Sequence, residues 1–265
     1  MKAARSHLSL LSNGDTNWKY RIERDSREEG KRKLKLQGKE LLAVPLNIFD
    51  MEELEVLEMT PERESCLTYR MEFVPREIGQ LRNLCVLNLD TNELKVIPAE
   101  IGLLEKLERL TLSNNFLSFL PKEISRLQKL TSLHMANNHF RELPLQICQL
   151  KNLIFLDASD NKIKVIPHHI QNLAKLETLL LFFNRLEMLP DTFCNLRNLR
   201  TLWLGKNKIR RLPRRFGDLV KLEWRDEQCS SNFEENPLEH PPIAVCRSGI
   251  KGIKNYFSGW RDEEY

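Results

Sequence analysis

Histidine, cysteine and aspartate are the side chains of this 265-residue chain that could bind a metal or transfer protons. His134 and His139 lie 23 residues or so before Asp157 and Asp160, and the chain repeats with a 23-residue period. This spacing brings the four residues near one another on one face, where an acid–base pair or a metal site is conceivable. The alternative is a polar surface patch, and we favour it. His168 and His169 follow a proline where other units have charged residues, which indicates a solvated surface.

The six cysteines do not form a metal or redox motif, because no CxxC pair occurs. Cys148 and Cys194 occupy matching places two repeats apart. At about 4.8 Å per strand that separation is roughly 10 Å, beyond the roughly 7 Å that a disulfide spans. We therefore interpret both as packing residues.

Sequence motifs for common chemistries are missing as well. The chain has no GxGxxG, no GxxxxGK[ST] and no HExxH. We therefore expect no catalytic residues, no metal, no cofactor and no enzymatic activity.

What organises the chain is a repeat of 23 residues. Three residue types recur with this step in at least six successive units, which does not arise by chance. They are leucines 84, 107, 130, 153, 176, 199 and 222, asparagines 92, 115, 138, 161, 184 and 207, and prolines 98, 121, 144, 167, 190 and 213.

Each part of the unit has a physical role. The LxxLxL segment predicts a short strand whose alternate side chains, such as Leu110 and Leu112, point inward. An asparagine amide carries donors and acceptors, so a stacked row of asparagines can satisfy the buried backbone of the turn. Proline favours an extended exit, and Ile124 and Leu127 return a short helical turn to the core. One unit cannot bury its apolar face alone, so stability requires stacking.

The two ends are irregular. We expect a charged segment at 1–30, of which 1–12 is disordered and Trp18 and Ile22 share a helix face, and about eight repeats over 31–221. A cap at 222–258, closed by a helix around 243–258, precedes a tail at 259–265. The units at 54–83 and 222–242 are longer than the rest, which predicts a bulging loop in the first and a stretched cap in the second.

The run LPKEISRLQKLTSLHMANNHFRELP resembles the intracellular 23-residue class of leucine-rich repeats, which includes Ras-binding, Ras-suppressor and plant Ras-group-related scaffolds. The ending NPLEHPPIAVCRSGIKGIKNYF is similar to the cap of such arrays. The resemblance covers about 31–257. It implies an α/β leucine-rich-repeat solenoid with a concave parallel sheet, short helices or irregular turns on the convex face and a C-terminal helical cap. A protein partner is implied on the sheet, such as a small GTPase, a phosphatase or a signalling complex.

Function should lie in the variable strand places, because the regular places carry the fold. The third, fifth, seventh and eighth places of LxxLxLxx point to solvent on the concave face. They are small and polar in the N-terminal half. In the C-terminal half they form a cluster that predicts a binding surface: Phe155, Leu180, Phe182, Phe183 and Trp203, with Arg200 and Lys206 at its border. A secondary polar patch comprises His134, Asp157 and Asp160. The alternative role for the rings is a lateral ladder that only stabilises the sheet.

Eight basic residues lie between Lys206 and Arg225 against Asp218 and Glu223. A solvated surface is one interpretation, and an acidic protein surface is another. A third is a polyanion such as RNA or anionic lipid, although the run lacks the interleaved aromatics that stack on bases. A substrate adaptor for a separate enzyme also fits, since it needs no catalytic residue.

Composition narrows the class of protein. A net charge of +4 is mildly basic and does not by itself imply nucleic acid. No apolar run approaches the roughly 18 residues of a membrane span, and the first eleven residues are too broken for a signal-peptide core. With no N-glycosylation sequon either, we expect a cytoplasmic protein.

Overall fold

The protein is described by a computed structural model that covers residues 21–61, 69–224 and 231–259. The expectations for residues 1–12, for Trp18 and for much of the bulge at 62–68 lie outside these residues, as do Cys66, Arg225 and Cys229. No helix of the described residues is long and apolar enough to cross a membrane.

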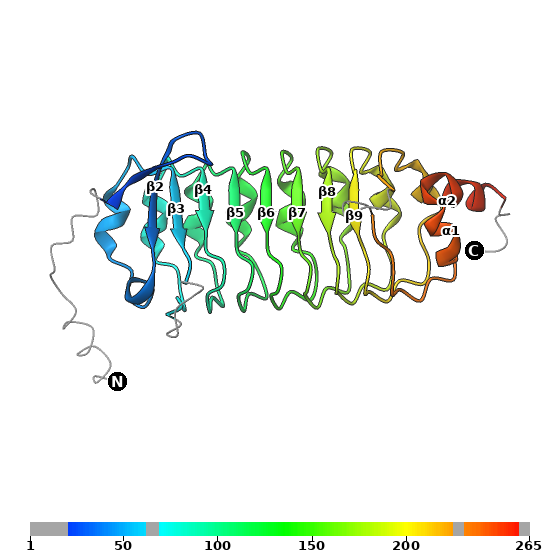
Figure 1. The fold of residues 1–265 in the computed structure, drawn as a ribbon, viewed down its shortest axis with the longest axis horizontal. Helices are drawn as coiled ribbons and strands as arrows, with labels where there is room; N and C mark the ends of the chain where they lie inside the picture. The colour runs from blue at the N-terminus through cyan, green and yellow to red at the C-terminus, as the bar shows by residue number, and fades with distance from the viewer. Residues whose placement is uncertain (1–20, 62–68, 225–230, 260–265) are drawn as a thin grey trace.

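The described strands form one nine-stranded sheet whose spatial order follows the sequence (Figure 1). All neighbours are parallel except the first pair, which is an antiparallel hairpin. Leu87, Leu110 and Leu133 stand opposite one another in successive strands, as the 23-residue period predicts. The strands are β1 Glu23–Asp25, β2 Lys31–Leu36, β3 Val56–Met59, β4 Val86–Asn88, β5 Arg109–Thr111, β6 Ser132–His134, β7 Phe155–Asp157, β8 Thr178–Leu180 and β9 Thr201–Trp203.

Short 3-10 helices form the opposite, convex side of the solenoid (Figure 1). From η3 on, each begins directly after a proline, whose fixed φ and extended ψ end the preceding segment. They are η2 Gly38–Leu41, η3 Leu46–Asp50, η4 Arg76–Gln80, η5 Ala99–Leu103, η6 Lys122–Arg126, η7 Leu145–Gln149, η8 His168–Asn172, η9 Asp191–Asn195 and η10 Arg214–Asp218. The fold is therefore the predicted solenoid.

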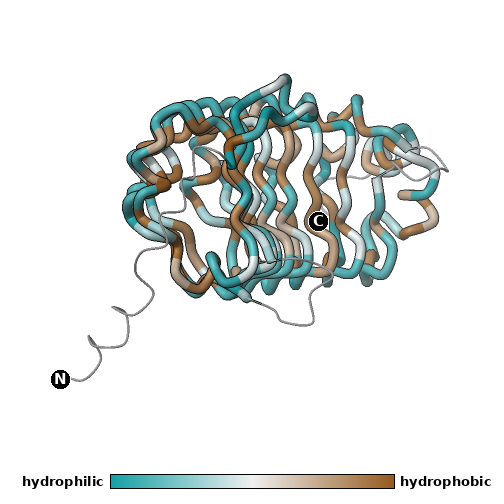
Figure 2. The backbone as a smooth tube through the Cα atoms, turned by 60° about the vertical axis from the view of Figure 1, so that its left-hand side comes forward, coloured by the Kyte–Doolittle hydropathy of each residue, from teal (hydrophilic) through white to brown (hydrophobic). Residues whose placement is uncertain are grey.

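The core lies between the sheet and the 3-10 helices and runs continuously along the solenoid. Leucine and isoleucine of each unit are fully buried, as at Leu110, Leu112 and Ile124. Figure 2 shows the hydrophobic positions in the strands and along the inner side of the coil, with hydrophilic residues at the turns. Cys148, Cys194 and Cys246 are unpaired and buried, and burial raises the pKa of each thiol to about 12. They pack rather than react.

A row of buried asparagines ties successive turns together. Asn138 accepts a hydrogen bond from the Leu117 amide at 2.9 Å and donates to the carbonyls of Leu112, Met135 and Ala136. The same pattern recurs at the other five asparagines of the repeat. The row continues into the cap at Asn236, which accepts from the Ile209 amide and which the 23-residue step does not identify.

The C-terminal cap has two helices, α1 Ile243–Arg247 and α2 Gly249–Ser258, where we expected one. Gly249 at φ 77° breaks the helix, since this left-handed conformation suits glycine. The break lets α2 turn back, and its Ile253 and Phe257 are buried against the last repeat. Residues 231–236 run alongside β9 and the residues after it, joined to them by backbone hydrogen bonds. Trp224 stacks on Phe233 with ring centroids 5.2 Å apart.

Candidate protein-binding surface on the sheet

The N-terminal half of the sheet face is covered by charges that neutralise one another. Lys33 pairs with Asp25 at 3.0 Å and with Glu58 at 2.9 Å. Its hydrogen bond to Asp25, together with one from the Arg27 amide, holds the pKa of Asp25 below its usual value. Arg109 pairs with Glu28 from the β1–β2 turn. Lys31 pairs with Glu108 as well. Acid and base side chains are therefore satisfied within this half, which leaves little unpaired charge for a partner.

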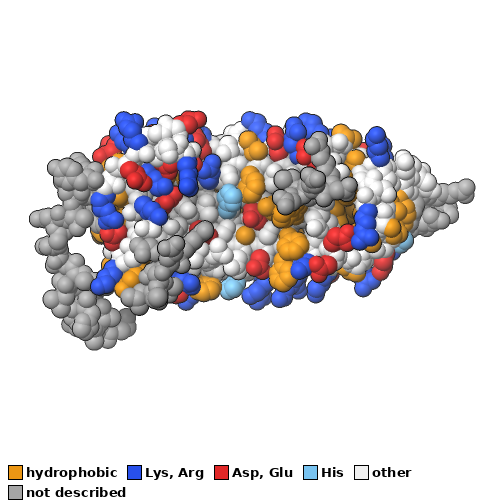
Figure 3. Space-filling view, viewed as in Figure 1, with side chains coloured by type: hydrophobic (Ala, Val, Ile, Leu, Met, Phe, Trp, Pro, Cys, Tyr) orange, Lys and Arg blue, Asp and Glu red, His pale blue; other side chains and the backbone are white. Residues whose placement is uncertain are grey.

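The C-terminal half of the face is apolar. In Figure 3 charged side chains crowd the N-terminal strands, whereas hydrophobic side chains show around β7 and β8. The predicted cluster is here: Phe155, Leu180, Phe182 and Trp203 are partly exposed and Phe183 is 52% exposed. We call these five residues the aromatic patch. Lys206 lies against its rings, and Arg200 stands just before β9, where it pairs with Glu177 at 3.6 Å and Glu223 at 3.8 Å.

Local contacts hold two rings of the patch in place. The ammonium group of Lys206 lies 5.5 Å from the ring centroid of Phe182 and 5.8 Å from that of Phe183, within reach of a cation–π interaction. The ring of Phe182 lies over the backbone of Gly205, where a Cβ would come within 3.1 Å of it. Lys206 also pairs with Glu235 of the cap at 3.5 Å. The rings are thus ordered before any partner arrives.

The border of the patch toward β6 is acidic. Neither Asp157 nor Asp160 has an ion pair with a described residue, and Asp157 accepts a hydrogen bond from the Ser159 amide. His134 stands opposite Asp157 in the sheet register. Its ring packs against Phe155 with centroids 4.6 Å apart and its Nε2 lies 3.0 Å from the Ser132 hydroxyl.

The cluster of four residues that the sequence predicted, His134, His139, Asp157 and Asp160, does not form. His139 lies beside Phe116 on the turn after β6, with ring centroids 5.7 Å apart, rather than on the sheet face. Among residues 21–61, 69–224 and 231–259 no group of three or more histidine, cysteine or acidic side chains is arranged to hold a metal ion. His168 and His169 are exposed, which agrees with a solvated surface.

His134 makes the stability of this half depend on pH. Burial lowers its pKa below the usual 6.5 and outweighs the opposing attraction of Asp157. The unfolded chain therefore binds a proton at a pH where the folded chain does not, so stability falls as pH drops below about 6.5. We expect the melting temperature of the wild type, measured relative to His134→Gln, to decrease between pH 7.5 and pH 5.5. A constant difference across this range would contradict the assignment.

The C-terminal basic run is less open than its sequence suggested. Acids of the cap pair with it: Glu239 with Arg210 at 2.5 Å and Glu235 with Lys206. Arg215 pairs with Asp218 at 3.2 Å, and Lys221 donates to Asn198. The stretched cap brings these acids back alongside the last repeat. This pairing could not be read from the sequence, because the partners are 29 residues apart.

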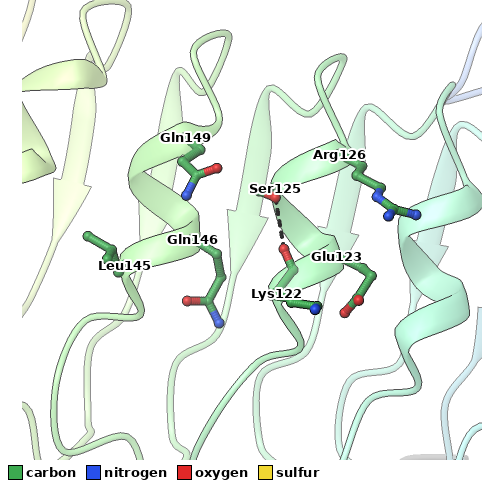
Figure 4. A pocket seen from close by; sticks show the side chains of 7 residues that line it. All are labelled: Lys122, Glu123, Ser125, Arg126, Leu145, Gln146 and Gln149. Atoms are coloured by element: carbon green, nitrogen blue, oxygen red, sulfur yellow. Dashed lines mark hydrogen bonds between the residues drawn. The ribbon is translucent and has the colours of Figure 1, made fainter.

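A hollow of about 390 Å³ lies on the convex side between η6 and η7 (Figure 4). Its rim is polar, with Lys122, Arg126, Gln146 and Gln149 directed around it. The Ser125 hydroxyl donates to the Lys122 carbonyl at 2.8 Å, so the one hydroxyl in the wall is already bonded within its own turn. This hollow lacks the buried, unsatisfied polar groups of a ligand site.

Comparisons with known proteins agree with the repeat geometry. One family model, a leucine-rich repeat region, matches residues 109–179, and a second, a leucine-rich repeat, matches residues 175–196. The fold is a leucine-rich-repeat solenoid. A leucine-rich-repeat protein of Leptospira interrogans is similar to it at 34% identity and a TM-score of 0.73, covering 84% of this chain and 52% of that one.

A second similar structure is the ectodomain of the Arabidopsis thaliana membrane receptor kinase GASSHO1/SCHENGEN3, in complex with Casparian Strip Integrity Factor 2. It matches at 26% identity and a TM-score of 0.61, covering 78% of this chain and 24% of that one. This leucine-rich-repeat protein thus spans about half of the first structure and about a quarter of the second. The comparison with curated proteins gives no match. Leucine-rich-repeat domains generally mediate protein–protein interactions.

Proposed function

We propose that this leucine-rich-repeat protein binds a protein partner on its sheet face, with the aromatic patch as the anchor and Arg200 and Lys206 orienting the partner. Five large apolar side chains gather on one face, four of them partly exposed and Phe183 exposed, and an exposed apolar patch is typical of an interface. Its composition, aromatic with basic residues at the rim, is that of binding hot spots. The secondary patch of His134, Asp157 and Asp160 supplies the polar border.

The backbone of Phe183 is the observation that carries the proposal. Phe183 has φ 57°, in the left-handed region that costs roughly 1–2 kcal/mol for a residue with a Cβ. This place has a positive φ in every unit from Thr91 to Lys206, and the three units before β8 hold Asn114, Asn137 and Asp160, residue types that tolerate this conformation. Unit β8 instead places a phenyl ring there and exposes 52% of it to water. Strain and exposure together are costs that a binding role explains.

The contacts of the rings argue against a purely stabilising ladder. A ladder of the patch requires the rings of β7, β8 and β9 to stack on one another. In the described part of the chain Phe155 instead lies against the tilted ring of His134 of β6, and Phe183 meets Phe182 of its own segment at 6.3 Å. No ring contact joins Phe155 to either of them among the described residues. These rings are therefore left with surface that a partner can cover.

The class of repeat, the location and the kind of partner are assigned from the resemblance to known leucine-rich repeats. We assign the chain to the intracellular 23-residue class of Ras-suppressor type, acting as a cytoplasmic scaffold or as a substrate adaptor for a separate enzyme. Small GTPases, phosphatases and signalling complexes are the partner classes that this resemblance favours. Free thiols at Cys85, Cys148, Cys194 and Cys246 support a reducing compartment. The polyanion alternative is weakened by the cap acids that pair with the C-terminal basic run.

The test replaces Phe183 by asparagine and compares captured proteins by quantitative mass spectrometry. Phe183→Asn should lower capture of the specific partner about 100-fold, which corresponds to the loss of a hot-spot ring. The melting temperature should stay the same or rise, because asparagine relieves the left-handed strain. Trp203→Ala should lose the same partner.

Phe119 offers a matched control, since it is the same residue type with 51% exposure on a different surface. Phe119→Asn should retain the partner. Loss of stability in Phe183→Asn with unchanged capture would instead assign the rings to the stabilising role.

A further inference from the structure

A second row of exposed apolar side chains follows the edge of the solenoid at which the strands end. In each unit the fourth residue after the row asparagine is at the surface, and it is apolar except at Glu142 and Arg211. Its exposure is 49% at Val96, 51% at Phe119, 59% at Val165 and 67% at Met188. Phe73 is also 67% exposed and holds the same place in the unit before. The Met71 amide donates to Asn92 as the Leu94 amide donates to Asn115, and Phe73 and Val96 each follow two residues later. Large apolar groups recurring at one exposed place require an explanation beyond packing.

The side chains at this place form one row across the units. Parallel bridges pair Glu142 with Val165 and Met188 with Arg211, so successive units are in register here and these two apolar side chains each stand beside a charged one. Neighbouring units are therefore about 4.8 Å apart along it. The turns after β4 to β9 end at about the same level in Figure 1. A flat edge of this kind contacts a plane along its whole length.

Basic side chains accompany the apolar row in the C-terminal units. The first and third residues after each row asparagine include a set of exposed or partly exposed cations: Arg141, Lys162, Lys164, Arg185 and Lys208. None of these five has an ion pair among the described residues, in contrast to Arg210, which pairs with Glu239. In Figure 3 Lys and Arg side chains line this lower edge to the right of centre. Glu142 and Glu187 are the acids within the same units.

We propose that this strand-end edge docks on an anionic lipid surface. Unpaired lysine and arginine beside exposed phenylalanine, valine and methionine is the composition that places a protein in the headgroup region. The straight edge suits a bilayer, which is flat, and does not form a groove for a peptide. A second copy of the chain is a poor occupant, because two edges of the same excess charge repel. This surface is separate from the aromatic patch, so docking leaves the sheet face open.

Co-sedimentation with vesicles tests the proposal. Wild-type protein should bind vesicles of phosphatidylcholine with about 30% phosphatidylserine and should not bind pure phosphatidylcholine. Each basic residue near an anionic leaflet strengthens binding about fivefold. The triple variant Lys164→Glu, Arg185→Glu and Lys208→Glu should therefore bind at least about 100-fold more weakly, and binding of the wild type should fall as salt is raised.

The opposite edge provides the matched control. Lys129, Lys151 and Lys175 lie before the strands, and changing all three to glutamate alters the net charge by the same amount. This variant should retain most vesicle binding. Equal loss in both triple variants, or no binding of wild type to the phosphatidylserine vesicles, would overturn the proposal.

A third variant tests the apolar part and the independence of the two surfaces. Phe119→Ser with Met188→Ser should weaken vesicle binding about tenfold at unchanged charge. Phe183→Asn should bind vesicles as wild type does. If the serine variant binds normally, the edge acts by charge alone and lipid insertion is refuted. Binding of a single-stranded RNA in place of vesicles, lost in the same triple variant, would also refute it.

Discussion

Replacing Asn138 by alanine is expected to lower the free energy of unfolding by about 4 kcal/mol. The side chain makes four hydrogen bonds to backbone groups of two successive units and is only 4% exposed. Alanine leaves the Leu117 amide buried with no partner in the turn, which costs about 1–3 kcal/mol. It also removes three donated hydrogen bonds, although the Leu112 carbonyl keeps the one from the Asn115 side chain at 3.1 Å. Urea unfolding followed by circular dichroism measures the loss.

Asn137 is the matched control, because it is the adjacent asparagine and is exposed. In the part of the chain that the structure describes, the side-chain amide of Asn137 donates only to the side chain of Asn114, at the surface. Its φ is 50°, so glycine is the replacement that keeps the backbone unstrained. Asn137→Gly should cost less than about 1 kcal/mol. Similar losses in the two variants would show that the buried row is not what joins the turns.

Loss of one asparagine from the buried row should also change the cooperativity of unfolding. Each unit contacts only its neighbours, so the stability of a solenoid is a sum of unit and interface terms. Asn138 lies midway along the array and links β6 to the unit before it. We therefore expect Asn138→Ala to broaden the urea transition or to split it. A variant that keeps one sharp transition would indicate that apolar packing alone couples the two halves.

The sequence predicted the repeats well because their signal is periodic. Leu110 and Asn115 recur with one step, and identical places in a solenoid have identical surroundings. The same logic identified the aromatic patch, since the outward places follow once the inward ones are known. Periodicity is silent where the units differ. Asn236 and Gly249 lie in the stretched cap, where the 23-residue step no longer applies.

Charge pairing was the other feature that the sequence could not supply. Arg109 meets Glu28, which is 81 residues away on the β1–β2 turn. That hairpin was not predicted, so the N-terminal half of the sheet face could not be recognised as neutralised. Phe183 shows the same limit: its exposure follows from its place in the unit, whereas its strain is visible only in the backbone. Both findings distinguish β7 to β9, whose outward places carry aromatic rings, from the neutralised N-terminal half of the face.

The packing of the convex side leads to the second large prediction, at Gly102. A Cβ there would lie 2.6 Å from the Glu123 carbonyl oxygen and 2.7 Å from the Glu123 Cβ, so η5 and η6 would have to separate. The chain carries cysteine at the matching places 148 and 194, both fully buried. The repeat pattern alone would therefore allow cysteine at position 102. The close backbone contact leaves no space for a side chain, and we expect Gly102→Cys to lower the free energy of unfolding by about 3 kcal/mol by overpacking.

Ser125 holds the matching place in the next unit and provides the control. It borders the hollow between η6 and η7, so a side chain already fits there (Figure 4). Ser125→Cys changes little volume and should cost less than about 1 kcal/mol in the same urea titration under reducing conditions. If Gly102→Cys is tolerated equally, the spacing of the 3-10 helices is set by the sheet and adjusts freely. If only Gly102→Cys is destabilising, contacts on the convex side fix how closely successive units stack.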